Sequence, residues 1–153
     1  MTFCVSKGLS APVGSVLCGS QAFIAEARRA RKVVGGGLRQ AGVLAAAGIV
    51  ALETMVDRLA EDHANAKRLA EGLADTPGFV ADPERVRTNM VYFALSPDVA
   101  VDAPEVERRL AGRGVLLFAE SKRHFRAVTH AWVTADEIDR ALLAFRAVLA
   151  NRG

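Results

Sequence analysis

The chain has 153 residues, enough to bury the core of one ordinary domain, so its length does not exclude a stable globular protein. Apolar residues make up 51% of the sequence and charged residues 24%, which is typical of a globular rather than a disordered chain. The net charge of +3 is too small to indicate binding to nucleic acid or to a membrane surface.

The cysteines and the apolar runs of the sequence indicate where in the cell the protein is located. Cys4 and Cys18 are too few for a disulfide framework, and no Cys/His cluster accompanies them to bind zinc. The longest apolar run, 41–52, is well short of the roughly 20 residues that cross a bilayer. The N-terminus also lacks a basic stretch followed by a hydrophobic signal core. We therefore expect a cytoplasmic protein that binds no metal, membrane or nucleic acid.

The first forty residues predict a strand, a loop, a strand and a helix. Two β-prone runs, 3–5 and 16–18, lie on either side of a segment rich in glycine, serine and proline. Ser20 is suited to cap the following helix, which the glycines at 35–37 are expected to end.

From residue 41 to about 75, apolar side chains recur at helical spacing. This pattern predicts one long helix, and Gly48 is where a bend is expected. Gly72 and the sequence Thr76-Pro77-Gly78 supply a stop.

The remaining residues predict a compact α+β region. Thr134 and Glu137 form a capping box for the last helix, whose apolar side chains recur at helical spacing. Asn89 is interpreted as satisfying backbone groups near a strand start, and Trp132 as a packing residue. The other elements are expected as strands at 90–95, 115–118 and 125–128 and a helix at 103–111.

One lysine, Lys7, lies at the end of the first predicted strand, in the loop VSKGLSAPVGS. Its small neighbours leave it open to a ligand and would let a flat aromatic cofactor approach closely. Such a lysine can condense with an aldehyde to form a Schiff base when its surroundings leave part of the amine uncharged. On residue types alone, a solvated surface lysine is the simpler interpretation.

Three further basic residues are candidates for a site. Arg39 follows the glycines 35–37 where a helix starts, and free amides there favour an anion, although a plain corner between two helices explains the glycines as well. Lys32 lies near the same turn, as a site residue or as a solvated cation. Arg126 lies in the apolar strand FRAV, and guanidinium groups bind carboxylates through paired hydrogen bonds. His130 and His63 are interpreted as structural.

These segments follow one another in the order SKGLSAPVGS, RKVVGGGLRQAGVLAAAG, RLAEDHANAKRLAEGL, TNMVYF and FRAVTH. With this order and spacing, the sequence resembles the low-specificity threonine aldolases over 3–149. The resemblance implies an α/β fold, namely the C-terminal portion of a pyridoxal-phosphate-dependent, transferase-like enzyme of fold type I. It implies three parts: the end of a large cofactor-binding domain at 1–40, a connecting helix at 41–75, and a small α+β domain at 76–153.

The resemblance also implies roles for the candidate residues. Lys7 would bind pyridoxal 5'-phosphate covalently, Arg39 and Lys32 would lie near the cofactor phosphate, and Arg126 would bind the substrate α-carboxylate. The implied reaction is the cleavage of L-threonine or L-allo-threonine to glycine and acetaldehyde by a carbon–carbon lyase. The implied assembly is a homo-oligomer, a tetramer or a dimer.

The chain begins only a few residues before the lysine motif, whereas members of this family carry a larger N-terminal portion. That portion is expected to supply a histidine that stacks on the cofactor, an aspartate for its pyridine nitrogen, most phosphate ligands and another arginine. We prefer the interpretation that this chain is part of a threonine aldolase and functions only within the full chain. The alternatives are one chain of a split enzyme completed by a separate N-terminal chain, a non-catalytic remnant that oligomerises or binds a partner, and, least favoured, a DNA-binding module.

Overall fold

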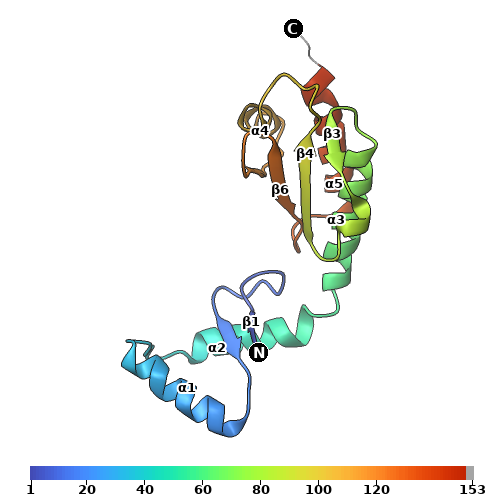
Figure 1. Ribbon diagram of the computed structural model, residues 1–153. Helices are drawn as coiled ribbons and strands as arrows, with labels where there is room; N and C mark the ends of the chain where they lie inside the picture. Colours follow the sequence, from blue (N-terminus) through green and yellow to red (C-terminus); the bar gives the residue numbers. More distant parts are fainter. Residues whose placement is uncertain (151–153) are drawn as a thin grey trace. The chain divides into compact units, whose positions relative to one another are not determined.

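The computed structural model describes residues 1–150 and divides into two compact units, the first Met1–Leu59 and the second beginning at Ala60 (Figure 1). The last three residues of the expected domain 76–153 lie outside the described residues. The expected three-part division stays a prediction, and each unit is described here by itself. No helix in the described part of the chain is both long and apolar enough to cross a membrane.

The first unit consists of a two-stranded antiparallel ribbon and two helices. Strands β1 (Thr2–Cys4) and β2 (Ser15–Leu17) pair with Phe3 opposite Val16. Helices α1 (Gln21–Val33) and α2 (Gly42–Thr54) follow. This order confirms the predicted strand, loop, strand and helix. A small core consists of the buried Val5, Leu9, Ala11 and Ala51, with Phe3, Val16, Met55 and Leu59 packed against it.

Helix α1 begins and ends as its sequence predicts. The Ser20 hydroxyl accepts a hydrogen bond from the Phe23 N–H at 3.3 Å, which satisfies one of the free amides of the first turn. At the other end, the Val34 N–H donates to the Ala30 carbonyl, and Gly35 has a φ of 86°. Because this left-handed conformation suits glycine, the helix ends there.

The single helix predicted over 41–75 is wrong. The structure has two helices, α2 and α3 (Leu59–Ala74), separated by a turn at 55–58. The hydroxyl of Thr54 donates to the carbonyl of Val50 at 2.7 Å, a local bond that β-branched Thr forms at the expense of helix continuity. The apolar spacing continues through this turn, which is why periodicity alone joins the two helices.

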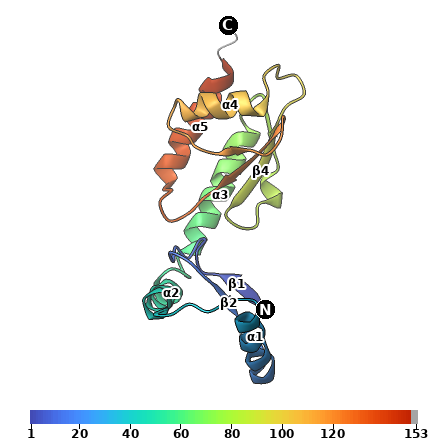
Figure 2. The same cartoon turned by 90° about the vertical axis from the view of Figure 1, so that its left-hand side faces the viewer.

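The second unit is a four-stranded antiparallel sheet with helices packed on one of its faces (Figures 1 and 2). The strand order is β3-β4-β6-β5. Strands β4 and β6 and helix α4 confirm the predicted elements, and β3 was not predicted. The elements after α3 are β3 (Phe79–Ala81), the 3-10 helix η1 (Pro83–Arg85), β4 (Met90–Leu95), α4 (Ala103–Ala111), β5 (Phe118–Ala119), β6 (His124–Val128) and α5 (Ala135–Ala150).

The strand predicted at 115–118 is also wrong, since β5 starts only at Phe118. Gly114 has a φ of 79°, and the N–H of Val115 donates back to the carbonyl of Leu110 at 3.0 Å. The backbone of Val115 is thus used to close the end of α4 and is not available for strand pairing.

The core of the second unit is built on phenylalanines from the inner face of the sheet. Phe93 and Phe125, paired across β4 and β6, stack with ring centroids 4.8 Å apart. Phe79 meets Phe145 of α5 edge to face at 5.2 Å. Successive strand residues point to opposite faces, so Tyr92 between the buried neighbours of β4 is 57% exposed. The helices add further buried side chains, among them Leu69, Leu73, Val106, Leu110, Leu142 and Val148.

Local hydrogen bonds around the last helix match the predicted capping box. The Thr134 N–H donates to the Glu137 carboxylate at 2.7 Å, and the Glu137 N–H donates to the Thr134 hydroxyl at 3.3 Å. The first of these bonds holds the pKa of the Glu137 carboxyl below its usual value.

The Asn89 amide donates to the Thr129 carbonyl at 2.8 Å, which confirms that Asn89 satisfies a backbone group near a strand start. Trp132 is 79% exposed, so its interpretation as a packing residue is wrong.

Two phenylalanines on neighbouring strands give a matched test of this core. Phe125→Ala should lower the free energy of unfolding by about 3–5 kcal/mol, because Phe125 is fully buried and the helices cannot close the cavity. Phe118→Ala should change it by less than about 0.5 kcal/mol, because Phe118 is 69% exposed. Urea unfolding followed by circular dichroism measures both. Equal losses in the two variants would contradict the assignment of the buried face.

Candidate functional site

Lys7 is exposed on the loop between β1 and β2, and hydrogen bonds fix the loop backbone around it. The Val5 N–H donates to the Gly14 carbonyl at 3.1 Å, and the Ala11 N–H donates to the Val5 carbonyl at 3.0 Å. The Ser10 N–H donates to the Lys7 carbonyl at 2.8 Å. The lysine side chain therefore extends into solvent from a backbone whose position is defined.

Apolar side chains on both sides of Lys7 anchor this loop. Val5 precedes it, Leu9 and Ala11 follow it, and all three are buried together with Ala51 of α2. The loop thus alternates between residues that enter the small core and residues that face outward. A fixed loop presents a nucleophile in one orientation, as covalent catalysis requires.

Gly14 closes the loop in a conformation that suits glycine. Its φ is 127°, and a Cβ at this position would lie 3.3 Å from the Cγ2 of Val5. Any larger residue would be strained there and would press on a core side chain. The sequence signal, a glycine within a run of small residues, predicts such a turn but not its contact with Val5.

A hollow of about 480 Å³ lies beside the ribbon in the first unit. Arg31 and Ser15 are its polar members, and Lys7 is not among its lining residues. Sequence reasoning did not single out Arg31, because it belongs to a run of basic residues on α1. The remaining walls are Val5, Val13, Gly14, Val16, Leu38, Ala41, Leu44, Ala45, Gly48, Ile49 and Leu52.

Lys32 and Arg39 lie at the two ends of the glycine turn between α1 and α2, and both are exposed. The ammonium of Lys32 lies 3.0 Å from the position that a Cβ would take on Gly37. Glycine at this position therefore leaves room for the lysine to fold back over the turn. Arg39 lies just before α2, whose N-cap residue, Ala41, makes no side-chain hydrogen bond.

Arg126 lies in β6 of the second unit, on the outer face of the sheet. Its neighbour Phe125 points into the core, and the register places Arg126 directly opposite Tyr92 on β4 and Phe118 on β5. The Nε of Arg126 lies 3.5 Å from an oxygen of Glu120. This Nε is buried and makes no hydrogen bond to the residues that the structure describes. Sequence reasoning missed Glu120, because its proximity to Arg126 depends on the turn between β5 and β6.

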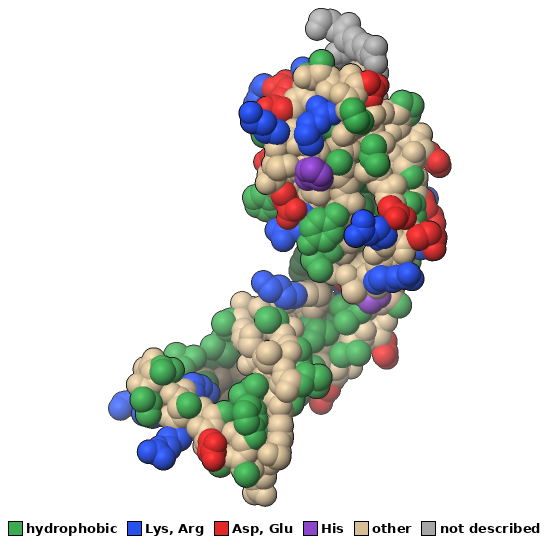
Figure 3. All heavy atoms as spheres, viewed as in Figure 1, with side chains coloured by type: hydrophobic (Ala, Val, Ile, Leu, Met, Phe, Trp, Pro, Cys, Tyr) green, Lys and Arg blue, Asp and Glu red, His purple; other side chains and the backbone are tan. Residues whose placement is uncertain are grey.

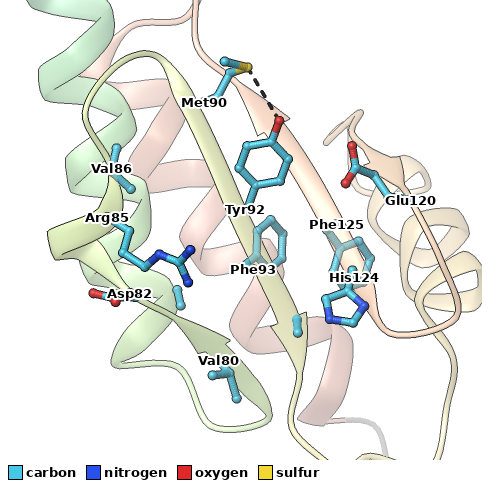
Figure 4. A pocket seen from close by; sticks show the side chains of 12 residues that line it. Val80, Asp82, Arg85, Val86, Met90, Tyr92, Phe93, Glu120, His124 and Phe125 are labelled. Atoms are coloured by element: carbon cyan, nitrogen blue, oxygen red, sulfur yellow. Dashed lines mark hydrogen bonds between the residues drawn. The ribbon is translucent and has the colours of Figure 1, made fainter.

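A second hollow of about 480 Å³ opens on the outer face of the same sheet (Figure 4). Tyr92, Glu120 and His124 line it from β4 and the β5–β6 hairpin, and Arg85 lines it from η1. The Tyr92 hydroxyl lies 3.8 Å from the sulfur of Met90. Charged and aromatic side chains thus meet on this face.

The predicted site residues divide between the two units. Lys7, Lys32 and Arg39 belong to the first unit and Arg126 to the second. The ring nitrogen Nδ1 of His130 accepts a hydrogen bond from the Trp132 N–H at 3.2 Å, the kind of backbone support predicted for it. Within residues 1–150, no three His, Cys, Asp or Glu side chains are grouped so as to hold a metal ion.

Comparison with known proteins identifies the family. Residues 1–96 match the model of the beta-eliminating lyase family. The chain is 41% identical over 143 residues to low-specificity L-threonine aldolase 1 of Arabidopsis thaliana. This alignment covers 94% of this chain and 40% of that protein. The chain is 42% identical over 150 residues to the low specificity L-threonine aldolase of Escherichia coli K12, covering 98% of this chain and 43% of that protein.

Solved structures agree on the fold. A Listeria monocytogenes protein assigned as an L-allo-threonine aldolase superposes with a TM-score of 0.77 at 21% identity, over 97% of this chain and 44% of that one. An aspartate aminotransferase of Thermus thermophilus superposes with a TM-score of 0.65 at 20% identity, over 97% of this chain and 48% of that one. The chain therefore has the α/β fold of part of a fold type I enzyme.

The chain matches only part of the length of its relatives. The chain spans less than half the length of these relatives, 40% and 43% of the two threonine aldolases. Within that span the similarity runs through both units, from the loop that carries Lys7 to the sheet that carries Arg126. The chain belongs to the beta-eliminating lyase family, whose members are pyridoxal-phosphate-dependent and include the low-specificity L-threonine aldolases.

Proposed function

We propose that this chain is the C-terminal portion of a threonine aldolase, a lyase that cleaves L-threonine and L-allo-threonine to glycine and acetaldehyde. The main support is the identity of 41% and 42% to two relatives that carry this name, over 94% and 98% of the chain. The activity belongs to the complete enzyme. A homo-oligomeric assembly, as a tetramer or dimer, and a cytoplasmic location are part of the same proposal.

The residues of the first unit fit pyridoxal phosphate. The amine of Lys7 is exposed on a loop that three hydrogen bonds fix, and the cations Lys32 and Arg39 lie at one turn of the same unit. Lys7 would hold the cofactor covalently through Nζ, and the two cations would balance the phosphate charge. When bound, the cofactor supplies a ring that accepts the electron pair released as the Cα–Cβ bond of the substrate breaks.

Arg126 would bind the α-carboxylate of the substrate. Its guanidinium lies on the outer face of the sheet, and its Nε has an unused donor among the described residues. A carboxylate that accepts two parallel hydrogen bonds from this group is held in one orientation. The role of Arg126 is thus to orient the substrate, while Lys7 holds the cofactor that activates it.

Reduction with borohydride tests the role of Lys7 without an activity assay. Borohydride converts the bond between a lysine and pyridoxal phosphate into a stable amine, and peptide mass spectrometry then locates the label. We expect the chain to acquire a visible absorbance band with the cofactor and to carry the label on Lys7. Lys7→Ala should abolish both, whereas Lys122→Ala should abolish neither, because Lys122 is an equally exposed loop lysine of the second unit. Equal labelling of the two variants would refute the assignment.

A second candidate function is one chain of a split enzyme, or an interaction module without catalysis. The observation that favours it is the exposed apolar surface of the first unit, where hydrophobic side chains are widespread (Figure 3). Helix α1 has no buried residue, which is unusual for a helix that has all its partners. The exposed apolar side chains of this unit include Phe23, Val33, Val34, Leu38, Val43, Ile49 and Val50.

Reconstitution separates a chain that takes part in catalysis from an interaction module without catalysis. The chain alone should cleave L-threonine weakly or not at all, because it spans only 43% of the Escherichia coli relative. Addition of a second chain, consisting of the portion of that relative which this chain does not span, should yield a stable complex and raise cleavage at least tenfold. The complex is measured by size-exclusion chromatography and the acetaldehyde by a coupled assay. A complex without cleavage would favour the interaction module, and full activity of the chain alone would contradict both proposals.

A further inference from the structure

Arg126 stands in a row of side chains that crosses three strands on the outer face of the second unit. The register places Tyr92 of β4 opposite Arg126 on one side and Phe118 of β5 opposite it on the other. Side chains that are directly opposite in antiparallel strands have Cβ atoms about 5 Å apart. Arg126 therefore has an aromatic residue on each side of it on the outer face of the sheet.

The ion pair between Arg126 and Glu120 is incomplete. In the same unit, Arg68 and Asp139 form a two-point pair, with Nε to Oδ1 at 2.8 Å and a terminal nitrogen to Oδ2 at 2.6 Å. The contact from the Nε of Arg126 to Oε1 of Glu120 is 3.5 Å, and this buried Nε makes no hydrogen bond to any described residue. Glu120 thus neutralises the charge of Arg126 without using its Nε donor.

Glu120, unlike Arg126, borders the hollow on the outer face of the sheet. It lines the hollow on the outer face, together with Tyr92 and His124, whereas Arg126 is not among the lining residues (Figure 4). Its own backbone is held by a hydrogen bond from its N–H to the carbonyl of His124 at 2.8 Å. Its side chain is 40% exposed, so the carboxylate can move away without unfolding the turn. A carboxylate bound in this hollow would therefore lie beside Glu120, which contacts Arg126.

We propose that Glu120 is an internal competitor for the substrate carboxylate: it occupies Arg126 loosely in the free protein and is displaced when a substrate binds. The inference rests on the proposed role of Arg126. Glu120 acts through Arg126: the strand register places this arginine on the outer face, and Glu120 pairs with it while leaving its Nε without a hydrogen bond.

The test uses the whole chain and needs neither cofactor nor turnover. Arginine side chains are labelled with ¹⁵N, and the Nε–H resonance of Arg126 is followed while L-threonine is added. L-Threoninol, which lacks the carboxylate, is the matched ligand control. Glu120→Gln removes the competing charge, Glu120→Asp keeps it, and Glu71→Gln removes one charge from an exposed position on α3 as a control for net charge. Arg126→Lys and Arg126→Gln test the arginine, with the other arginine resonances reporting binding.

We expect Glu120→Gln to bind L-threonine about two- to fivefold more tightly than the unchanged chain, the range that a half-exposed ion pair allows. Glu120→Asp and Glu71→Gln should bind as the unchanged chain does, and L-threoninol should not bind. The role of Glu120 would be overturned if Glu120→Gln bound L-threonine no more tightly than the unchanged chain while both Arg126 variants lost binding. It would also be overturned if no variant bound L-threonine. Unchanged binding in both Arg126 variants would instead remove Arg126 from the proposed function.

Discussion

The pairing of β4 with β6 is the interaction on which the second unit depends. Phe93 and Phe125 are directly opposite in this pair and stack inside the core. Because strand side chains alternate between faces, their burial turns Tyr92 and Arg126 to the outer face. A slip of one residue in the pairing would place the guanidinium among phenylalanines and expose the aromatic ring of Phe125. The cost of burying an unpaired charge excludes that register. The core therefore also fixes the position of Arg126, the residue proposed to bind the substrate carboxylate.

The loop of the first unit follows the same rule on a smaller scale. Val5, Leu9 and Ala11 enter a small core, and the residues between them face outward. Lys7 is among the residues that face outward. In both units, buried apolar side chains within two residues of the candidate residue anchor the backbone that carries it.

Much of the fold could be predicted from the sequence because its signals are local. The expected bounds of the strand at 90–95 and of the helix at 103–111 match the structure, because alternating or helical spacing lies within the segments themselves. The turn at 55–58 could not be predicted, because it interrupts a spacing that continues on both sides. The proximity of Glu120 to Arg126 depends on a hairpin and a strand register, and no local pattern records these. Lys7 was found through a resemblance between motifs, because its loop by itself does not distinguish a cofactor lysine from a solvated one.

The unequal cores of the two units have a consequence for synthesis. Within this chain the first unit is synthesised before the second, yet it has only a small core around Ala51, and many of its large apolar side chains are exposed. The larger core, around Phe125, is completed only when α5 has been made. A nascent chain in which the first unit has been made and the second has not therefore exposes apolar helices without a large core, a condition under which chains aggregate or recruit chaperones.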